Sequence, residues 1–251
     1  MTRRSLGLLL IGTATACGSA SRSPAPLGNT PAGDNAAGTA AVPCPAGTEL
    51  EAAARKAWAA PAAATITSEC VALRADRPLW LIHGYAEQSN DDGWFVDLHT
   101  ALVTTGGATT MLESDTGLPP AAIERGGASY TAVDFDGDGR DELLVFSGYM
   151  HGGYEQSWIH ARAITGEGKL AATTAPNLPL TSDNTAAAPD PADAYSCLAS
   201  HKLIDRPGGG HLVEIVAEPA TGAVSGQECP APGRHVYGWD GDKLVEVAGA
   251  P

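Results

Sequence analysis

Five acidic residues within nine positions give one short stretch of the chain the composition of a metal-binding loop. The stretch runs from residue 134 to residue 142 and reads Asp-Phe-Asp-Gly-Asp-Gly-Arg-Asp-Glu. Acids at loop positions one, three and five converge oxygen atoms on one point, and glycine at position six permits the sharp bend that a Ca²⁺ site requires. We predict that Ca²⁺ is bound by the carboxylates of Asp134, Asp136 and Asp138, the backbone carbonyl of Arg140 and a closing carboxylate from Glu142.

The segment from Ala132 to Ser147 resembles the Ca²⁺ loop of the integrin-like FG-GAP and VCBS repeats, in which Asp-x-Asp-x-Asp-Gly-x-x-Asp/Glu joins two strands. The resemblance implies a structural ion that neutralises the carboxylates and fixes the strand connection. The loop is not an EF-hand, because position twelve is Val145 instead of Glu and an apolar β run follows. The sequence contains one such loop, so the resemblance implies the loop and its ligands but not a full propeller. The alternative is an acidic surface turn without an ion.

Two other patterns resemble parts of enzymes. Residues 134–137 resemble the nucleophile motif of haloacid-dehalogenase-type phosphatases, but that family has Thr where this chain has Asp138. Residues 79–85 resemble the strand and His-Gly turn of α/β-hydrolases, with His83 at the oxyanion hole. Such an enzyme needs Gly-x-Ser-x-Gly, and Ser147 lacks both glycines at the required positions. The sequence favours a non-catalytic protein, with a secreted hydrolase, α/β-hydrolase-like or metal-assisted, as the alternative.

The elements that must position the acidic loop are mainly strands. The chain holds 30 Gly and 18 Pro, which suits a turn-rich β fold better than a helical bundle. Apolar or alternating runs predict strands at residues 78–82, 94–103, 143–146, 157–161 and 212–216, and a hairpin at residues 236–247 around Asp240-Gly241. Short turns separate these runs. We therefore predict a mainly β fold of antiparallel sheets, arranged as a β-sandwich or a partial propeller.

One short helix is predicted before the strands. Residues 48–60 are rich in alanine, Thr48 and Glu51 have the spacing of a capping box, and Pro61 ends the run. Trp58 is expected to dock this helix on the rest of the domain. Residues 171–194, rich in Ala, Thr, Pro and Asp, predict a long loop.

The cysteines indicate an oxidising compartment. Once Cys17 is set aside, Cys44, Cys70, Cys197 and Cys229 remain, and an even number in an exported chain suggests two disulfides with three connectivities. We prefer Cys44–Cys70 and Cys197–Cys229, because each closes a loop of moderate length. Zinc is disfavoured, since no Cys-x-x-Cys spacing occurs.

The first residues of the chain have the form of an export signal. Residues 1–16 combine two arginines, a short apolar stretch and a small-residue end. The residues around Cys17 resemble a bacterial lipobox, the motif at which a signal is cleaved and the cysteine is acylated, although Ala14 stands where Leu is usual. The resemblance implies an anchor in the cell-envelope membrane, on its outer or periplasmic face; the alternative is a soluble secreted protein.

A flexible tether should connect this anchor to the folded part. Residues 17–43 are almost wholly small and polar, so they cannot bury enough surface to offset the entropy of ordering. Residues 44–251 are then a disulfide-braced β domain that contains the acidic loop. The formal net charge of −14 argues against nucleic acid as a partner and leaves a protein or a glycan as the open choice of ligand.

Overall fold

A computed structural model describes residues 40–75, 79–87, 97–104, 109–110, 127–165, 170–171, 177–222 and 229–248. They all belong to one unit, Asp34–Pro251. The predicted signal, Cys17 and the predicted tether up to residue 39 lie outside the described residues, as do residues 94–96 of one predicted strand. Among the described residues, no helix has the length and apolar character needed to cross a membrane.

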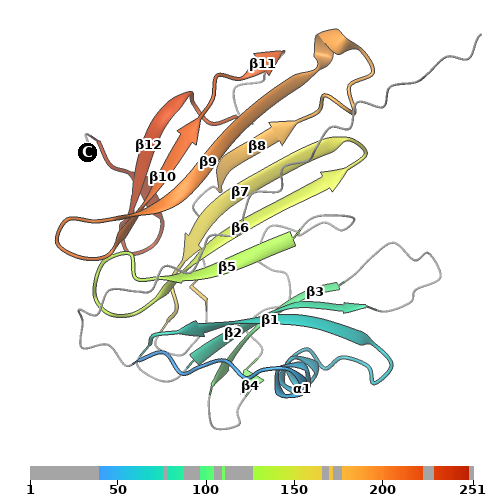
Figure 1. The fold of residues 1–251 in the computed structure, drawn as a ribbon, viewed down its shortest axis with the longest axis vertical. Coiled ribbons are helices and arrows are strands. Elements are labelled where there is room, and N and C mark those ends of the chain that lie inside the picture. The colour runs from blue at the N-terminus through green and yellow to red at the C-terminus, as the bar shows by residue number, and fades with distance from the viewer. Residues whose placement is uncertain are drawn as a thin grey trace, which may run out of the picture. The chain divides into compact units, whose positions relative to one another are not determined.

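The first sheet is a four-stranded antiparallel meander (Figure 1). Its strands are β1 (Thr65–Leu73), β2 (Leu79–Glu87), β3 (Asp97–Thr104) and β4 (Thr109–Thr110), and each pairs with the next one along the chain. The β1–β2 register runs without interruption from Thr65 opposite Glu87 to Leu73 opposite Leu79.

The second sheet has nine strands and is also antiparallel (Figure 1). Its strands are β5 (Gly127–Val133), β6 (Glu142–His151), β7 (Tyr154–Arg162), β8 (Leu178–Asp183), β9 (Tyr195–Asp205), β10 (His211–Ala217), β11 (Thr221–Gly222), β12 (Gly233–Trp239) and β13 (Leu244–Glu246). The order β13-β12-β10-β9-β8-β7-β6-β5 is a meander, and β11 pairs with β9. The prediction of a mainly β fold with antiparallel sheets is confirmed.

The apolar run in β6 is explained by burial on both faces of that strand. Leu143 and Val145 belong to a core that also contains Leu73, Leu79, Leu81 and Leu102 of the four-stranded sheet. Leu144, with Phe146 packed alongside, belongs to a second core shared with β7 to β10 and β12. Because successive side chains of a strand point to opposite faces, a strand between two cores needs apolar residues at consecutive positions.

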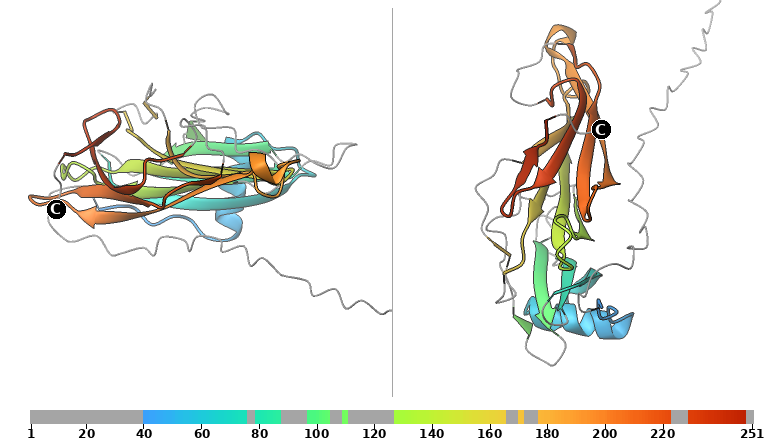
Figure 2. Two further views of the ribbon diagram at one scale, coloured as in Figure 1. Left: turned by 90° about the horizontal axis from the view of Figure 1, so that it is seen from above. Right: turned by 90° about the vertical axis from the view of Figure 1, so that its left-hand side faces the viewer.

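The predicted helix is present as α1 (Thr48–Ala57) and lies against the four-stranded sheet (Figure 2). Its buried residues Ala54 and Ala57 share a core with Ile82 and Ala101, and Trp58 belongs to the same core, which confirms its docking role. The capping-box prediction is wrong: Gly47 is the N-cap, and no side chain caps the helix. Thr48 is already the first helical residue, so its hydroxyl lies one position too late to serve as the cap.

Both preferred disulfides are confirmed. Cys44 is bonded to Cys70 in β1, and Cys197 in β9 is bonded to Cys229. A second contact fixes the chain close to the first disulfide, because the indole Nε1–H of Trp80 donates to the carbonyl of Val42 at 2.9 Å.

The prediction of a long loop at residues 171–194 is wrong for the described part of this segment. It contains β8 and a 3-10 helix, Pro191–Asp193, and the strand β9 that follows it was not foreseen either. β8 forms because it pairs with β7 and β9 and buries Leu180, which is a tertiary effect that composition does not reveal. The hairpin predicted at residues 236–247 is confirmed as β12 and β13.

Candidate metal-binding loop

The acidic loop connects β5 to β6, at the point where Val133 pairs with Glu142. Its first residue, Asp134, is buried and organises the backbone that follows. Gly137 N–H donates to one carboxylate oxygen of Asp134 at 2.7 Å, and Gly139 N–H donates to the other at 2.9 Å. Both glycines have φ between 80° and 90°, a conformation that other residues rarely adopt. The Asp-x-Asp-x-Asp-Gly spacing therefore folds the loop around Asp134.

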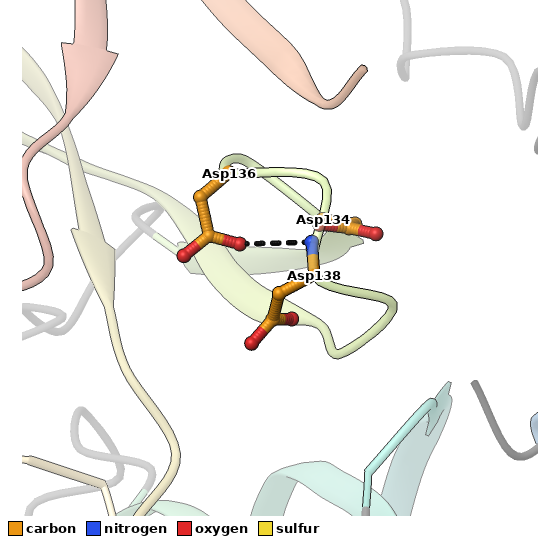
Figure 3. Close-up of side chains that lie close together, drawn as sticks. All are labelled: Asp134, Asp136 and Asp138. Carbon is orange, nitrogen blue, oxygen red and sulfur yellow. Dashed lines mark hydrogen bonds between the residues drawn. The ribbon is translucent and has the colours of Figure 1, made fainter. Parts of the chain in front are cut away.

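The next two aspartates are exposed and continue the pattern of side-chain-to-backbone hydrogen bonds. Asp138 N–H donates to Asp136 Oδ1 at 3.1 Å (Figure 3), and Arg140 N–H donates to Asp138 Oδ1 at 2.8 Å. One carboxylate oxygen each from Asp134, Asp136 and Asp138 lies within 4.8 Å of the other two. The structure thus brings these three predicted ligands together.

This group of oxygens is compact enough to hold a metal ion. Two oxygens that are each about 2.3–2.6 Å from one ion are separated by at most roughly 5 Å, and the three carboxylates fall within that limit. All three donors are anionic oxygens, which suit a hard cation such as Ca²⁺ and not a soft metal. An oxygen that accepts one N–H retains a lone pair for a cation, so the internal hydrogen bonds do not block ligation.

Glu142, the predicted closing ligand, is not part of this group. Its Oε2 instead accepts the backbone N–H of Phe135 at 3.0 Å across the base of the loop. Burial raises the pKa of Glu142 to about 7; the N–H of Phe135 opposes that rise, and the three loop aspartates add to it. Arg140 is exposed; its guanidinium lies 4.0 Å from an Asp138 carboxylate oxygen, and its backbone N–H donates to the other.

Asp141 is a structural residue of the loop that sequence reasoning missed. Its Oδ1 accepts from Nε and from a terminal nitrogen of Arg74 at 2.9 and 2.7 Å, and its Oδ2 accepts the Arg74 backbone N–H at 2.6 Å. The backbone N–H of Asp141 in turn donates a hydrogen bond to the Arg74 carbonyl at 2.9 Å. The hydrogen bond to Asp141 raises the pKa of the Arg74 guanidinium, and burial opposes it. Because Arg74 directly follows β1, these bonds attach the loop to the four-stranded sheet.

The loop is also attached to the turn between β9 and β10. His211 N–H donates to the Phe135 carbonyl at 3.2 Å, and His211 Nδ1 donates to the Asp134 carbonyl at 3.0 Å. Gly210 has φ +80°, and a Cβ there would collide with the Phe135 carbonyl oxygen. The fully buried Phe135 ring stacks on Trp239 with ring centroids 6.1 Å apart. The acidic loop is therefore a junction between β5–β6, the four-stranded sheet and the β9–β10 turn.

The two residues of the hydrolase alternative lie in the interior. His83, within β2, has its ring centroid 4.7 Å from that of Tyr130, and burial lowers its pKa while Glu69 opposes the shift. The Ser147 hydroxyl is buried and has no hydrogen-bond partner among the described residues. A serine nucleophile is activated through a hydrogen bond to a base, and the described residues show no such bond at Ser147.

Comparison of the chain with known proteins found no matching family model, no matching curated protein and no matching solved structure.

Proposed function

We propose that the chain is an exported, lipid-anchored protein of the cell envelope, in which a non-catalytic β domain carries a structural Ca²⁺ ion in its acidic loop. The observation that supports the ion is the convergence of three carboxylates within 4.8 Å. The signal-like start, the lipobox-like surroundings of Cys17 and the small-residue tether support the anchor. The domain then acts as a binding or structural component held at the membrane.

A structural role for the ion follows from where the loop is attached. Asp134 is buried and faces Arg74 at 3.8 Å, and the exposed Asp138 faces the guanidinium of Arg140 at 4.0 Å. A divalent cation would offset the mutual repulsion of the three carboxylates, which share a single bend. Because the same bend contacts Arg74 and His211, an ion that rigidifies it would also hold together the elements on either side.

The expected stabilisation can be given a magnitude. Extracellular Ca²⁺ modules bind with Kd of about 10⁻⁴–10⁻³ M. At 10 mM Ca²⁺ and a Kd of about 10⁻⁴ M, mass action raises the free energy of unfolding by about 2.7 kcal/mol. For a domain of this size that corresponds to a Tm increase of roughly 5–10 °C over the chelated protein.

The test is a thermal melt of the full chain in Ca²⁺, in Mg²⁺ and in chelator, with calorimetric titration of Ca²⁺ for stoichiometry. Asp136→Asn and Asp138→Asn each remove an exposed carboxylate of the group, and we expect them to abolish most of the Ca²⁺-dependent Tm increase. Asp242→Asn is the matched control, since Asp242 is exposed in the β12–β13 turn and lies outside the group. Equal Tm values in Ca²⁺ and chelator, together with no heat of binding, would contradict the proposed ion.

The anchor has a separate test. Mass spectrometry of the membrane fraction should show the chain beginning at an acylated Cys17. A chain that retains residues 1–16, or an unmodified cysteine in a soluble fraction, would contradict lipid anchoring.

A further inference from the structure

Two buried polar side chains lie on the face of β6 and β7 that also carries the contacts to the four-stranded sheet. In the β6–β7 register, Val145 is opposite His160 and Ser147 is opposite Trp158. Ser147 and His160 are therefore diagonal neighbours on one face, with Cα atoms roughly 7–8 Å apart. Val145, which is opposite His160 and two positions before Ser147 on this face, packs with residues of β1, β2 and β3.

These two side chains are buried without protein partners. Ser147 is 2% exposed and His160 is 4% exposed. The Ser147 hydroxyl and both ring nitrogens of His160 lack a hydrogen-bond partner among the described residues. An amide or hydroxyl buried without a partner costs about 1–3 kcal/mol in proteins. The three polar atoms of Ser147 and His160 lie on one patch of a β face, so a bound group that both donates and accepts hydrogen bonds would stabilise the fold.

We propose that Ser147 and His160 form an internal hydration site, in which a buried water bridges the serine hydroxyl and one imidazole nitrogen. A water has two donors and two lone pairs, so it matches either tautomer of a neutral imidazole and either orientation of a hydroxyl. One water spans two polar atoms about 5.5 Å apart, a separation that diagonal side chains on one face can reach. Internal waters of this kind typically satisfy buried polar groups that the protein leaves unpaired.

The charges around the site favour water over a metal ion. Arg162 follows His160 by two positions on β7, so it lies on the same face, and it is also buried. Its positive charge disfavours a cation next to the imidazole. Next to Ser147 and His160, the side chains that β6 and β7 place on this face are Val145, Trp158 and Arg162, and none of these is a carboxylate.

A double-mutant cycle on the full chain tests the proposal, with unfolding constants measured by urea denaturation at pH 7.5. In a hydrated site, Ser147→Ala removes a hydrogen bond, so the unfolding constant rises. His160→Phe then costs less in the Ser147→Ala background, and the two effects should depart from additivity by at least about threefold. In a dry site, Ser147→Ala removes an unsatisfied hydroxyl, so the unfolding constant stays the same or falls and the effects add; that result would overturn the proposal.

The control cycle pairs His160→Phe with Ser182→Ala. Ser182 is as buried as Ser147, but its hydroxyl lies 3.2 Å from the Tyr195 hydroxyl, so its partner is a protein atom. Ser182 is opposite Gln156, four positions along β7 from His160, and about 13 Å of strand separates the two sites. These two substitutions should add.

A crystal structure of the parent chain decides the matter if a variant does not fold. Density for a water within about 3.2 Å of both Ser147 Oγ and a ring nitrogen of His160 would support the proposal. Side chains enclosed only by carbon atoms would overturn it.

Discussion

Replacement of Arg74 by alanine is expected to be among the most damaging single changes to the acidic loop, although Arg74 lies 67 positions before its partner. The substitution removes the two side-chain N–H groups that bind Asp141 Oδ1 and leaves the backbone N–H of residue 74 in place. The Asp141 side chain is 4% exposed, so its charge would stay buried without a counterion.

The magnitude follows from that burial. Removing one partner of a buried ion pair destabilises a protein by about 3–5 kcal/mol. The Arg74 side chain is itself 25% exposed, and water screens part of the interaction, so we expect about 3 kcal/mol for Arg74→Ala. Arg74→Lys keeps the charge but cannot donate two parallel N–H groups, so about half of the loss should remain.

Urea unfolding at pH 7 measures these differences. Arg206→Ala is the matched control, because Arg206 is an exposed arginine in the β9–β10 turn, and its replacement should change stability by less than about 0.5 kcal/mol. If the free energy of unfolding of Arg74→Ala also lies within about 1 kcal/mol of that of the parent, then the buried Arg74–Asp141 pair contributes little to stability.

Three further changes test other parts of the structure. Burial lowers the pKa of His160 to about 4, so the unfolded chain takes up its proton first and stability is lost as the pH falls from about 6.5 to about 4. His160→Phe should remove about 3 kcal/mol of that loss in the free energy of unfolding, so its stability measured in urea should vary less with pH than that of the parent. Superimposable stability–pH profiles of variant and parent would refute the lowered pKa of His160. Gly210→Ala should lower the free energy of unfolding, measured in urea, by more than Gly208→Ala does. Both glycines have positive φ, so both substitutions carry about 1–3 kcal/mol of backbone strain, but only a Cβ at position 210 would collide with backbone atoms. Equal losses for the two variants would refute the close approach at Gly210. Replacing Cys197 and Cys229 together by serine should lower the free energy of unfolding by about 3–4 kcal/mol, and a loss below about 1 kcal/mol would show that this bridge does not constrain the unfolded chain.

The parts of the site that sequence reasoning reached are the local ones. Asp134, Asp136 and Asp138 lie within five positions, and two glycines permit the bend, so the sequence alone predicts that their carboxylates converge. Both disulfides close local loops of moderate length, with separations of 26 and 32 residues, and the sequence predicts them for that reason.

The missed parts depend on contacts between distant segments. No spacing rule connects Arg74 with Asp141, and Asp141 occupies a motif position that carries no ligand role. Glu142 has the spacing of a ligand but is used to bind the Phe135 N–H, because the β5–β6 register places it at the base of the loop. The strand β8 contains Pro179 within an Ala-, Pro- and Asp-rich segment, and only its pairing with β7 and β9 makes it a strand.

The Cys44–Cys70 bond has a mechanical consequence. A force applied to the chain ahead of Cys44 passes through the sulfur atoms directly into β1, so helix α1, which lies between the two cysteines, carries no load. Reduction would release the 26-residue separation as hidden contour length, about 90 Å when fully extended. The redox state of the Cys44–Cys70 bond thus determines how much chain lies between the point of pulling and β1.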